Sequence, residues 1–247
     1  MEADARVRLL FLDRDGTLNR SLGHRPPNAV EEVDLFEDLA SPLFPYVDQG
    51  WKLVIVTNQG GVASGYISDE QAHTVQQRVI DLLPVPIAAA YLCPHMPGAA
   101  VPRYDLDCPN RKPRPGFILH ALQRFGAQPH DCLLVGDSIT DRDAAHAAHV
   151  PFRWADQFFR RPIRRGMQTG DGDWFDVRQV SAGRGQLALQ ALERGELIGS
   201  LALSRLDGPE ALPDRAIEFS VQTEPHRVGV GLTLVEIAIE WLQGHTI

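Results

Sequence analysis

Short apolar runs alternate with longer segments of mixed polarity through the first part of the chain. Four of these runs have the length of buried strands, and they lie at Val7–Leu12, Leu53–Thr57, Val85–Leu92 and Cys132–Ser138. The segments between them predict helices at 31–48, from Ser68 to Leu83, from Pro115 to about Phe125 and at 141–148. Strands that alternate with helices in this way predict an α/β fold with a doubly wound, mainly parallel sheet.

Two acidic residues follow the first of these strands. Asp13 and Asp15 are separated by one residue, so an extended backbone points both carboxylates the same way. Gly16 then allows the chain to turn. Two carboxylates at the end of a buried strand repel each other, and a cation that prefers hard oxygen ligands, such as Mg²⁺, relieves that repulsion. The alternative interpretation is a strand-end turn that happens to contain aspartate. One such residue would favour that alternative, but two do not.

The ends of the later strands and the loops beside them carry further polar and charged groups. These candidates are Thr57, Asn58, Arg111, Lys112, Asp137 and Asp141. A hydroxyl such as that of Thr57, next to glycines, can hold an oxyanion, although the same residues also favour a plain turn. A proline-stiffened segment presents Arg111 and Lys112 either to a transferring phosphoryl group or to solvent. Because ligands of doubly wound sheets bind beyond the carboxyl ends of the strands, we expect these groups to converge.

Two thiols and an imidazole within one loop suggest a zinc site. They belong to Cys93, His95 and Cys108. A structural zinc site normally has four ligands, and Asn110 stands where a fourth is expected. Asp105, Asp107 and His120 are other possible sources of that ligand. A loop with two free cysteines is the alternative interpretation.

The composition predicts a water-soluble cytoplasmic protein. The chain has 247 residues, 44% of them hydrophobic and 23% charged, with a net charge of −8. The acidic balance makes nucleic acid an unlikely partner, and no apolar run is long enough to cross a bilayer. The polar N-terminus lacks the apolar core of a signal peptide. Three cysteines argue against a disulfide framework and for a reducing compartment.

The pattern changes after about residue 160. Arginines and then glycines and aspartates predict a linker at 161–184. Beyond it we expect a helix at 186–194, strands at 197–206 and 216–223, and an amphipathic helix from Leu232 to Leu242. The resulting division has a first domain at 1–160, the linker, and a small α+β segment at 185–247.

Residues 6 to about 157 resemble the haloacid dehalogenase (HAD) phosphatases. The resemblance is carried by five segments in matching order: Asp13–Asn19, Val56–Gly61 with Gly65-Tyr66, Cys93–His95, Arg111–Gly116 and Gly136–Asp141. They are most similar to the small branch without a large cap domain, which contains heptose-bisphosphate and histidinol-phosphate phosphatases. Two positions differ from that branch, because Asn110 replaces the last zinc cysteine and Ser64 replaces an arginine common before the Gly-Tyr pair.

The resemblance implies a Mg²⁺-dependent phosphomonoesterase that forms an aspartyl-phosphate on a small phosphorylated metabolite, such as a sugar phosphate. It implies Asp13 as the nucleophile, Asp15 as the general acid and base, and Mg²⁺ held by Asp13, Asp137 and the backbone carbonyl of Asp15. It further implies that Thr57, Asn58 and Lys112 contact the phosphoryl oxygens, that Arg111 contacts the rest of the substrate, for example a second phosphate, and that Asp141 supports Lys112 or the metal shell. Histidinol-phosphate phosphatase and nucleic-acid 3′-phosphatase activities remain as alternatives.

The C-terminal segment resembles the centre of a GNAT acetyltransferase, although it lacks the later elements of that fold. A possible coenzyme A loop is formed by His226, Gly229 and Gly231, where histidine replaces the usual glutamine or arginine. A second functional hypothesis is therefore a module that binds coenzyme A or an acyl group. A half-covered sheet would also favour a homodimer.

Overall fold

The computed structural model describes residues 6–21, 25–168, 173–183, 186–205, 217–224, 227 and 229–244. The chain divides into two compact units, Met1–Arg161 and Pro162–Ile247. Within the described residues, no helix is long and apolar enough to cross a membrane.

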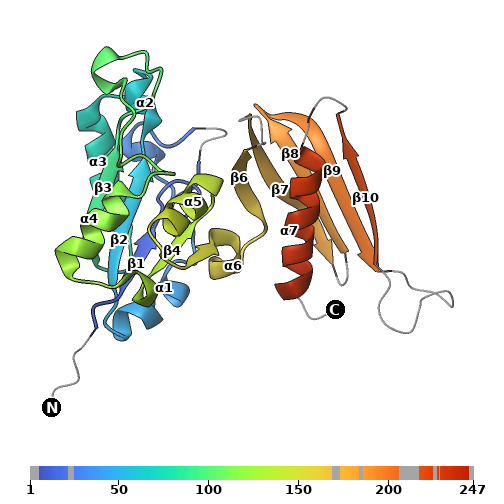
Figure 1. The fold of residues 1–247 in the computed structure, drawn as a ribbon, viewed down its shortest axis with the longest axis horizontal. Coiled ribbons are helices and arrows are strands. Elements are labelled where there is room, and N and C mark those ends of the chain that lie inside the picture. Colours follow the sequence, from blue (N-terminus) through green and yellow to red (C-terminus); the bar gives the residue numbers. More distant parts are fainter. Residues whose placement is uncertain are drawn as a thin grey trace. The chain divides into compact units, whose positions relative to one another are not determined.

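The first unit is built on a parallel sheet with the strand order β3-β2-β1-β4-β5 (Figure 1). Its strands are β1 (Leu9–Leu12), β2 (Lys52–Asn58), β3 (Ile87–Cys93), β4 (Leu133–Gly136) and β5 (Phe152–Trp154). Its helices are α1 (Ala40–Asp48), α2 (Gly60–Ala63), α3 (Asp69–Leu82), α4 (Gly116–Phe125), α5 (Ile139–Ala147) and α6 (Ala155–Phe159), with short 3₁₀ turns at Val30–Glu32, Pro102–Tyr104 and Pro129–Asp131. The expected doubly wound α/β fold is confirmed.

Strand β1 shows how the sheet is buried on both faces. Leu9 and Phe11 pack in one apolar cluster with side chains of α4 and α5, while Leu10 and Leu12 pack in a second cluster with side chains of α1 and α6. All four strand residues are fully buried. The sequence of a central parallel strand is therefore a continuous apolar run, because each face of the sheet needs its own apolar side chains.

Local signals fix the ends of two helices that border the site. Helix α3 begins with the expected capping box, in which the Ser68 hydroxyl accepts from the Gln71 amide and the Gln71 side chain accepts from the Ser68 amide. Helix α5 has the same arrangement between Ser138 and Asp141. The capping role orients Asp141 toward the carboxyl ends of the strands.

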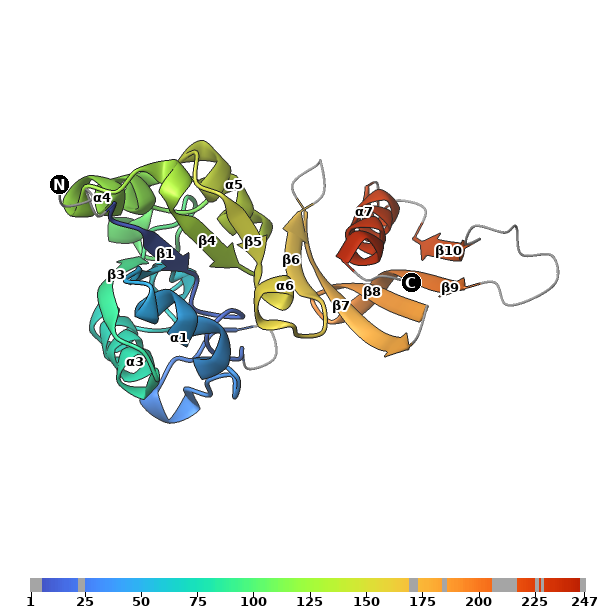
Figure 2. The same ribbon diagram turned by 90° about the horizontal axis from the view of Figure 1, so that it is seen from below.

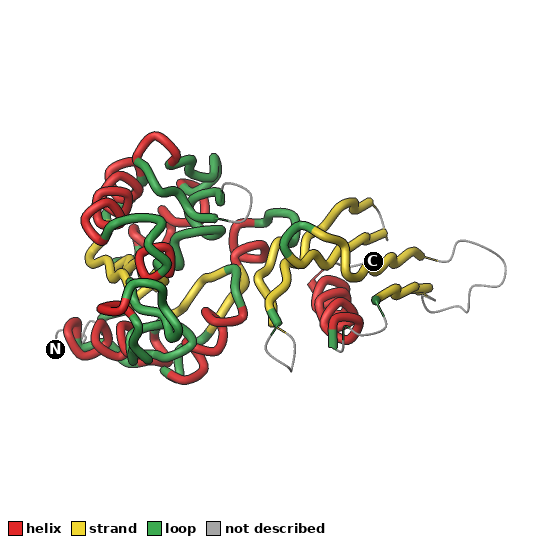
Figure 3. The backbone as a smooth tube through the Cα atoms, turned by 90° about the horizontal axis from the view of Figure 1, so that it is seen from above, coloured by secondary structure: helices red, strands yellow, loops and turns green. Residues whose placement is uncertain are grey.

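The second unit is an antiparallel sheet with the strand order β10-β9-β8-β7-β6 and one helix. Its elements are β6 (Arg164–Gln168), β7 (Trp174–Gly183), β8 (Gln186–Glu193), β9 (Glu196–Arg205), β10 (Ile217–Thr223) and α7 (Val230–Gly244). Helix α7 packs against β8, β9 and β10 (Figure 2), and strands make up most of this unit's described chain (Figure 3).

Two expectations for this region are wrong. The predicted linker at 161–184 contains β6 and β7, and the predicted helix at 186–194 is β8. In β8, Leu187, Leu189 and Ala191 are buried on one face. Residues with good helix propensity thus form a strand, because their two-residue alternation matches the adjacent strands.

Candidate active site

The carboxyl ends of β1, β2 and β4 bring the predicted acidic and hydroxyl groups to one edge of the sheet. Asp13 directly follows β1, Thr57 lies at the end of β2, and Asp137 directly follows β4. The amide of Asp13 donates to the carbonyl of Val135 at 3.0 Å, which fixes the backbone at the end of β1 against β4. Parallel strands end on the same side, so the topology itself produces this convergence.

Lys112 lies at the centre of the site and is only 4% exposed. Its Nζ is 2.5 Å from Asp13 Oδ1 and 2.5 Å from Asp141 Oδ1, and it donates to the carbonyl of Val56 at 2.8 Å. Burial alone would lower the pKa of Lys112, but the two carboxylates outweigh burial and raise it. The ammonium is therefore a fixed positive charge at the strand ends.

The Lys112 loop is held by the side chain of Asn58. The Asn58 Nδ2 donates to the Lys112 carbonyl at 2.9 Å, and its Oδ1 accepts from the Lys112 amide at 3.0 Å. Both polar atoms of the Asn58 side chain are thus engaged with the loop that carries the lysine. This contact gives Asn58 a positioning role that its place in the sequence does not predict.

Three carboxylates surround this one lysine. One oxygen from each of Asp13, Asp137 and Asp141 lies within 4.8 Å of the others. Burial raises the pKa of Asp13 to about 7, against the opposing charge of Lys112, and raises that of Asp137 well above its usual value. A divalent cation would relieve this excess of buried negative charge, so the donor set fits Mg²⁺.

Gly16 is needed beside these carboxylates. Its φ is +85°, and a Cβ at this position would lie 1.9 Å from Asp137 Oδ2. Both the left-handed backbone and the approach of the carboxylate exclude a larger residue. The glycine of the Asp-x-Asp-Gly motif therefore has a spatial reason as well as a turn-forming one.

Asp15 does not join the carboxylate group with its side chain. Its two oxygens accept from Arg14 at 3.1 and 2.9 Å, from Asn19 at 3.0 Å and from Gln59 at 2.6 Å. The Gln59 amide also donates to the Thr57 hydroxyl at 2.9 Å. Arg14 and Gln59 lie inside the motifs at the ends of β1 and β2, but their positions in the sequence do not predict these contacts.

Asp141 lies beside Lys112, whereas Arg111 contacts the backbone at His95. Asp141 accepts from the Ser138 amide at 3.0 Å and pairs with Lys112, so its contacts are those of a residue that supports the lysine rather than of a phosphate ligand. Arg111 donates to the carbonyl of His95 at 2.9 Å, and burial lowers its pKa.

The three candidate zinc ligands also come together. One ligand atom from each of Cys93, His95 and Cys108 lies within 4.8 Å of the others. Burial raises the pKa of Cys93 to about 11. The suggested fourth ligands are engaged elsewhere: the Asp105 carboxylate accepts from the Gly98 amide, Asp107 pairs with Arg114, and His120 packs edge-on against Tyr91.

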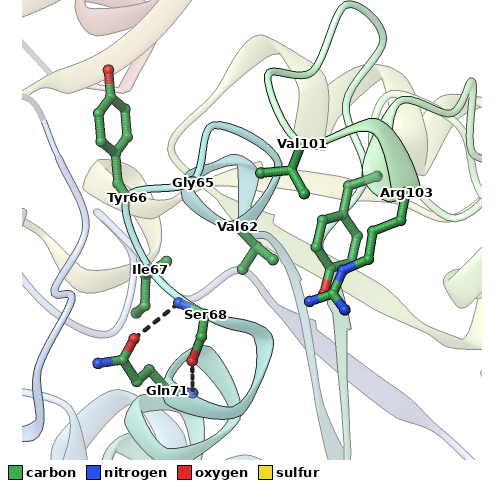
Figure 4. Close-up of a pocket in the computed structure, with 9 residues that line it drawn as sticks. Val62, Gly65, Tyr66, Ile67, Ser68, Gln71, Val101 and Arg103 are labelled. Atoms are coloured by element: carbon green, nitrogen blue, oxygen red, sulfur yellow. Dashed lines mark hydrogen bonds between the residues drawn. The ribbon is translucent and has the colours of Figure 1, made fainter.

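A pocket of about 260 Å³ opens beside the turn between α2 and α3 (Figure 4). It is lined by Val62, Gly65, Tyr66, Ile67, Ser68, Gln71, Val101, Arg103 and Tyr104. Ser68 and Gln71 direct their polar atoms at each other in the capping box, and the Arg103 guanidinium lies over the Tyr104 ring at 4.6 Å. The loop between β3 and α4 thus forms part of the pocket wall through Val101, Arg103 and Tyr104.

The possible coenzyme A loop is only partly described. His226 lies outside the described residues, Gly229 immediately precedes α7 with a φ of +89°, and Gly231 lies in the first turn of that helix. The interpretation of this loop remains a prediction.

The parallel sheet and its buried aspartate–lysine site define a HAD-like hydrolase, and the HAD-hydrolase-like family model matches residues 109–152. The heptose-1,7-bisphosphate 7-phosphatases of Photorhabdus laumondii and Haemophilus ducreyi are 30% and 34% identical to the chain, over 59% and 57% of it and 80% and 78% of their own lengths. The chain therefore belongs to the family of HAD-like phosphatases that includes these enzymes.

Solved structures agree with this assignment. A protein of Mesorhizobium loti described as a HAD-like phosphatase matches with a TM-score of 0.55 and 31% identity, over 59% of this chain and 70% of its own. The D,D-heptose 1,7-bisphosphate phosphatase of B. bronchiseptica, complexed with magnesium and phosphate, matches with a TM-score of 0.52 and 25% identity, over 59% of this chain and 79% of its own. These matches leave about two fifths of this chain uncovered.

Proposed function

We propose that this phosphatase hydrolyses a phosphate ester of a small sugar, of the heptose-bisphosphate type, through an aspartyl-phosphate on Asp13. The observation that carries the proposal is the buried Asp13–Lys112 pair beside Asp137 and Asp141. The substrate class is supported by the relatives at 30% and 34% identity, which are named for heptose-1,7-bisphosphate.

In the first step, a carboxylate oxygen of Asp13 attacks phosphorus, and the bond from phosphorus to the sugar oxygen breaks. Asp15 donates its proton to the departing oxygen. Lys112 neutralises charge on the phosphoryl oxygens, and the Thr57 hydroxyl donates to one of them. Arg111 contacts the remainder of the substrate, where its positive charge suits a second phosphate.

In the second step, Asp15 removes a proton from water, and the resulting hydroxide attacks the same phosphorus atom. The bond between phosphorus and Asp13 then breaks, which releases inorganic phosphate and restores the Asp13 carboxylate. The residues that would hold Mg²⁺ are Asp13, Asp137 and the backbone carbonyl of Asp15. Bound there, the cation would neutralise the charge that the phosphoryl group and the nucleophile bring together.

Phosphate release from a panel of phosphorylated metabolites tests this function. The panel holds heptose bisphosphate, histidinol phosphate, other sugar phosphates and a 3′-phosphorylated oligonucleotide, each with Mg²⁺ and with EDTA. We expect heptose bisphosphate to be preferred and EDTA to reduce turnover by roughly 100-fold or more, because no divalent cation then neutralises the charge that the phosphoryl group and the nucleophile bring together. A preference for the oligonucleotide, or full activity in EDTA, would contradict the proposal.

We also propose that Cys93, His95 and Cys108 bind one zinc ion, with the fourth position taken by a group other than the three side chains that are engaged elsewhere. Their ligand atoms already lie within 4.8 Å of one another. We expect protein purified without chelator to contain about one zinc per chain by elemental analysis, and Cys108→Ser to contain much less. Cys132→Ser serves as the control, because Cys132 is a buried free cysteine outside this group. Equal zinc contents in the two variants would exclude the site.

A further inference from the structure

The Asp15 carboxylate is held on all sides by donors. Each of its two oxygens accepts two hydrogen bonds: Oδ1 from Arg14 and Asn19, and Oδ2 from Arg14 and Gln59. The side chain is 15% exposed, so it still reaches the edge of the site. A carboxylate with both oxygens occupied in this way has one preferred orientation.

The two main donors are themselves fixed. Arg14 is fully buried, and its Nη1 donates to Gln76 Oε1 of α3 at 3.2 Å. Gln59 is 2% exposed, and its backbone amide donates to the Cys93 carbonyl at 2.8 Å. A buried guanidinium is costly unless it is paired, so the sequence places charge here for a specific partner.

Gln59 also joins two parts of the site. Its side-chain amide donates at once to Asp15 Oδ2, at 2.6 Å, and to Thr57 Oγ1, at 2.9 Å. The end of β2 and the loop after β1 are therefore tied through one amide group. Displacement of this amide would free both the carboxyl group and the hydroxyl.

We propose that Arg14 and Gln59 are positioning residues that hold the Asp15 carboxyl at the leaving-group oxygen, and that one of its four hydrogen bonds is given up when Asp15 carries the proton that it transfers. This inference rests on the proposed function, in which Asp15 transfers the proton. Proton transfer requires donor and acceptor within hydrogen-bond reach. Both steps in which Asp15 transfers a proton therefore slow down if its carboxyl can rotate away. Arg14 and Gln59 do not touch the phosphate in this scheme.

The test compares two leaving groups in the variant Gln59→Met, which keeps the length of the side chain and removes its donors. The p-nitrophenolate ion leaves phosphorus without a proton, whereas a sugar alkoxide needs one. We expect formation of the aspartyl-phosphate from sugar phosphate to slow by roughly 10- to 100-fold, while the burst of p-nitrophenolate changes by less than about threefold. KM should change little, because Thr57, Lys112 and Arg111 are all retained. Loss of the Gln59 contact to Thr57 affects both substrates alike, so it does not produce a difference between the leaving groups.

Gln77→Met is the matched control, since Gln77 is the exposed neighbour of Gln76 on α3. We expect wild-type rates on both substrates. Arg14→Lys keeps the charge but loses the paired hydrogen bonds to both oxygens of Asp15. It should likewise slow the reaction of the sugar phosphate more than that of p-nitrophenyl phosphate. Arg14→Lys carries the test if thermal unfolding shows that the methionine variant is not folded.

Equal losses on both leaving groups in folded variants, or a rise in KM alone, would overturn the inference, because either result indicates a structural or ground-state role. Wild-type sugar-phosphate turnover in folded Arg14→Lys would overturn it as well. If the wild type releases phosphate from neither substrate with Mg²⁺ present, the proposed function itself is wrong, so the two failures are distinguishable.

Discussion

Asp13→Asn is expected to lower turnover by roughly 10⁴-fold or more, because an amide cannot form the covalent intermediate. The fold should survive the change. Asparagine occupies the same volume, and Lys112 keeps Asp141 as a partner at 2.5 Å. Removal of one of three clustered carboxylates also reduces their mutual repulsion. Phosphate release with Mg²⁺, together with thermal unfolding, measures both effects.

The control for this substitution is Asp143→Asn. Asp143 lies on α5 and pairs with its neighbour Arg142, away from the carboxylate group. We expect normal turnover. The nucleophile assignment is contradicted if folded Asp13→Asn retains a stoichiometric burst of p-nitrophenolate, since such a burst requires a covalent acceptor.

The first unit could be predicted from sequence because its strands are buried on both faces. Runs such as Leu53–Thr57 have few polar interruptions, and helix start signals such as Ser68 with Gln71 lie between them. Strand β5 was missed because Phe152–Trp154 is too short to show a period. Helix α6 follows it directly, so no turn signal separates the two elements.

The second unit is harder to predict from sequence because one face of its sheet is covered by a single helix. Strand β8 consists mainly of leucine, alanine and glutamine, which favour a helix when the neighbouring strands are unknown. Strand β6 contains two arginines and a glycine, and it acquires its buried face only from tertiary contacts such as that of Arg165 with Glu240. Propensity is a weak guide where long-range pairing decides the structure.

In the site, motifs predict which residues take part, but not the long-range contacts that hold them. Asp13, Thr57, Lys112 and Asp137 follow from their positions at strand ends and in recognised motifs. The contacts of Asn58 with the Lys112 backbone span 54 residues of sequence. No local pattern predicts such a contact, because it depends on how two loops meet over the sheet.

Lys112→Met is expected to unfold the first unit more easily, because a buried carboxylate pair loses its only counter-charge among the described residues. Lys112 is 4% exposed and lies between Asp13 and Asp141. Removal of one partner of a buried ion pair costs roughly 3–5 kcal/mol, which corresponds to a fall in Tm of roughly 10 °C for a unit of this size. Added Mg²⁺ should raise the Tm of the variant more than that of the wild type, since the site then holds more uncompensated negative charge.

A second variant should recover part of the lost stability but none of the lost activity. Lys112→Met combined with Asp141→Asn removes one carboxylate, so we expect part of the lost Tm to return. Turnover should stay reduced by roughly 10³-fold in both variants, because the lysine ammonium no longer faces the phosphoryl oxygens. Calorimetry and phosphate release on the same samples measure the two effects. If the double variant recovered turnover together with Tm, the role of Lys112 would be to hold the fold rather than to stabilise the phosphoryl group.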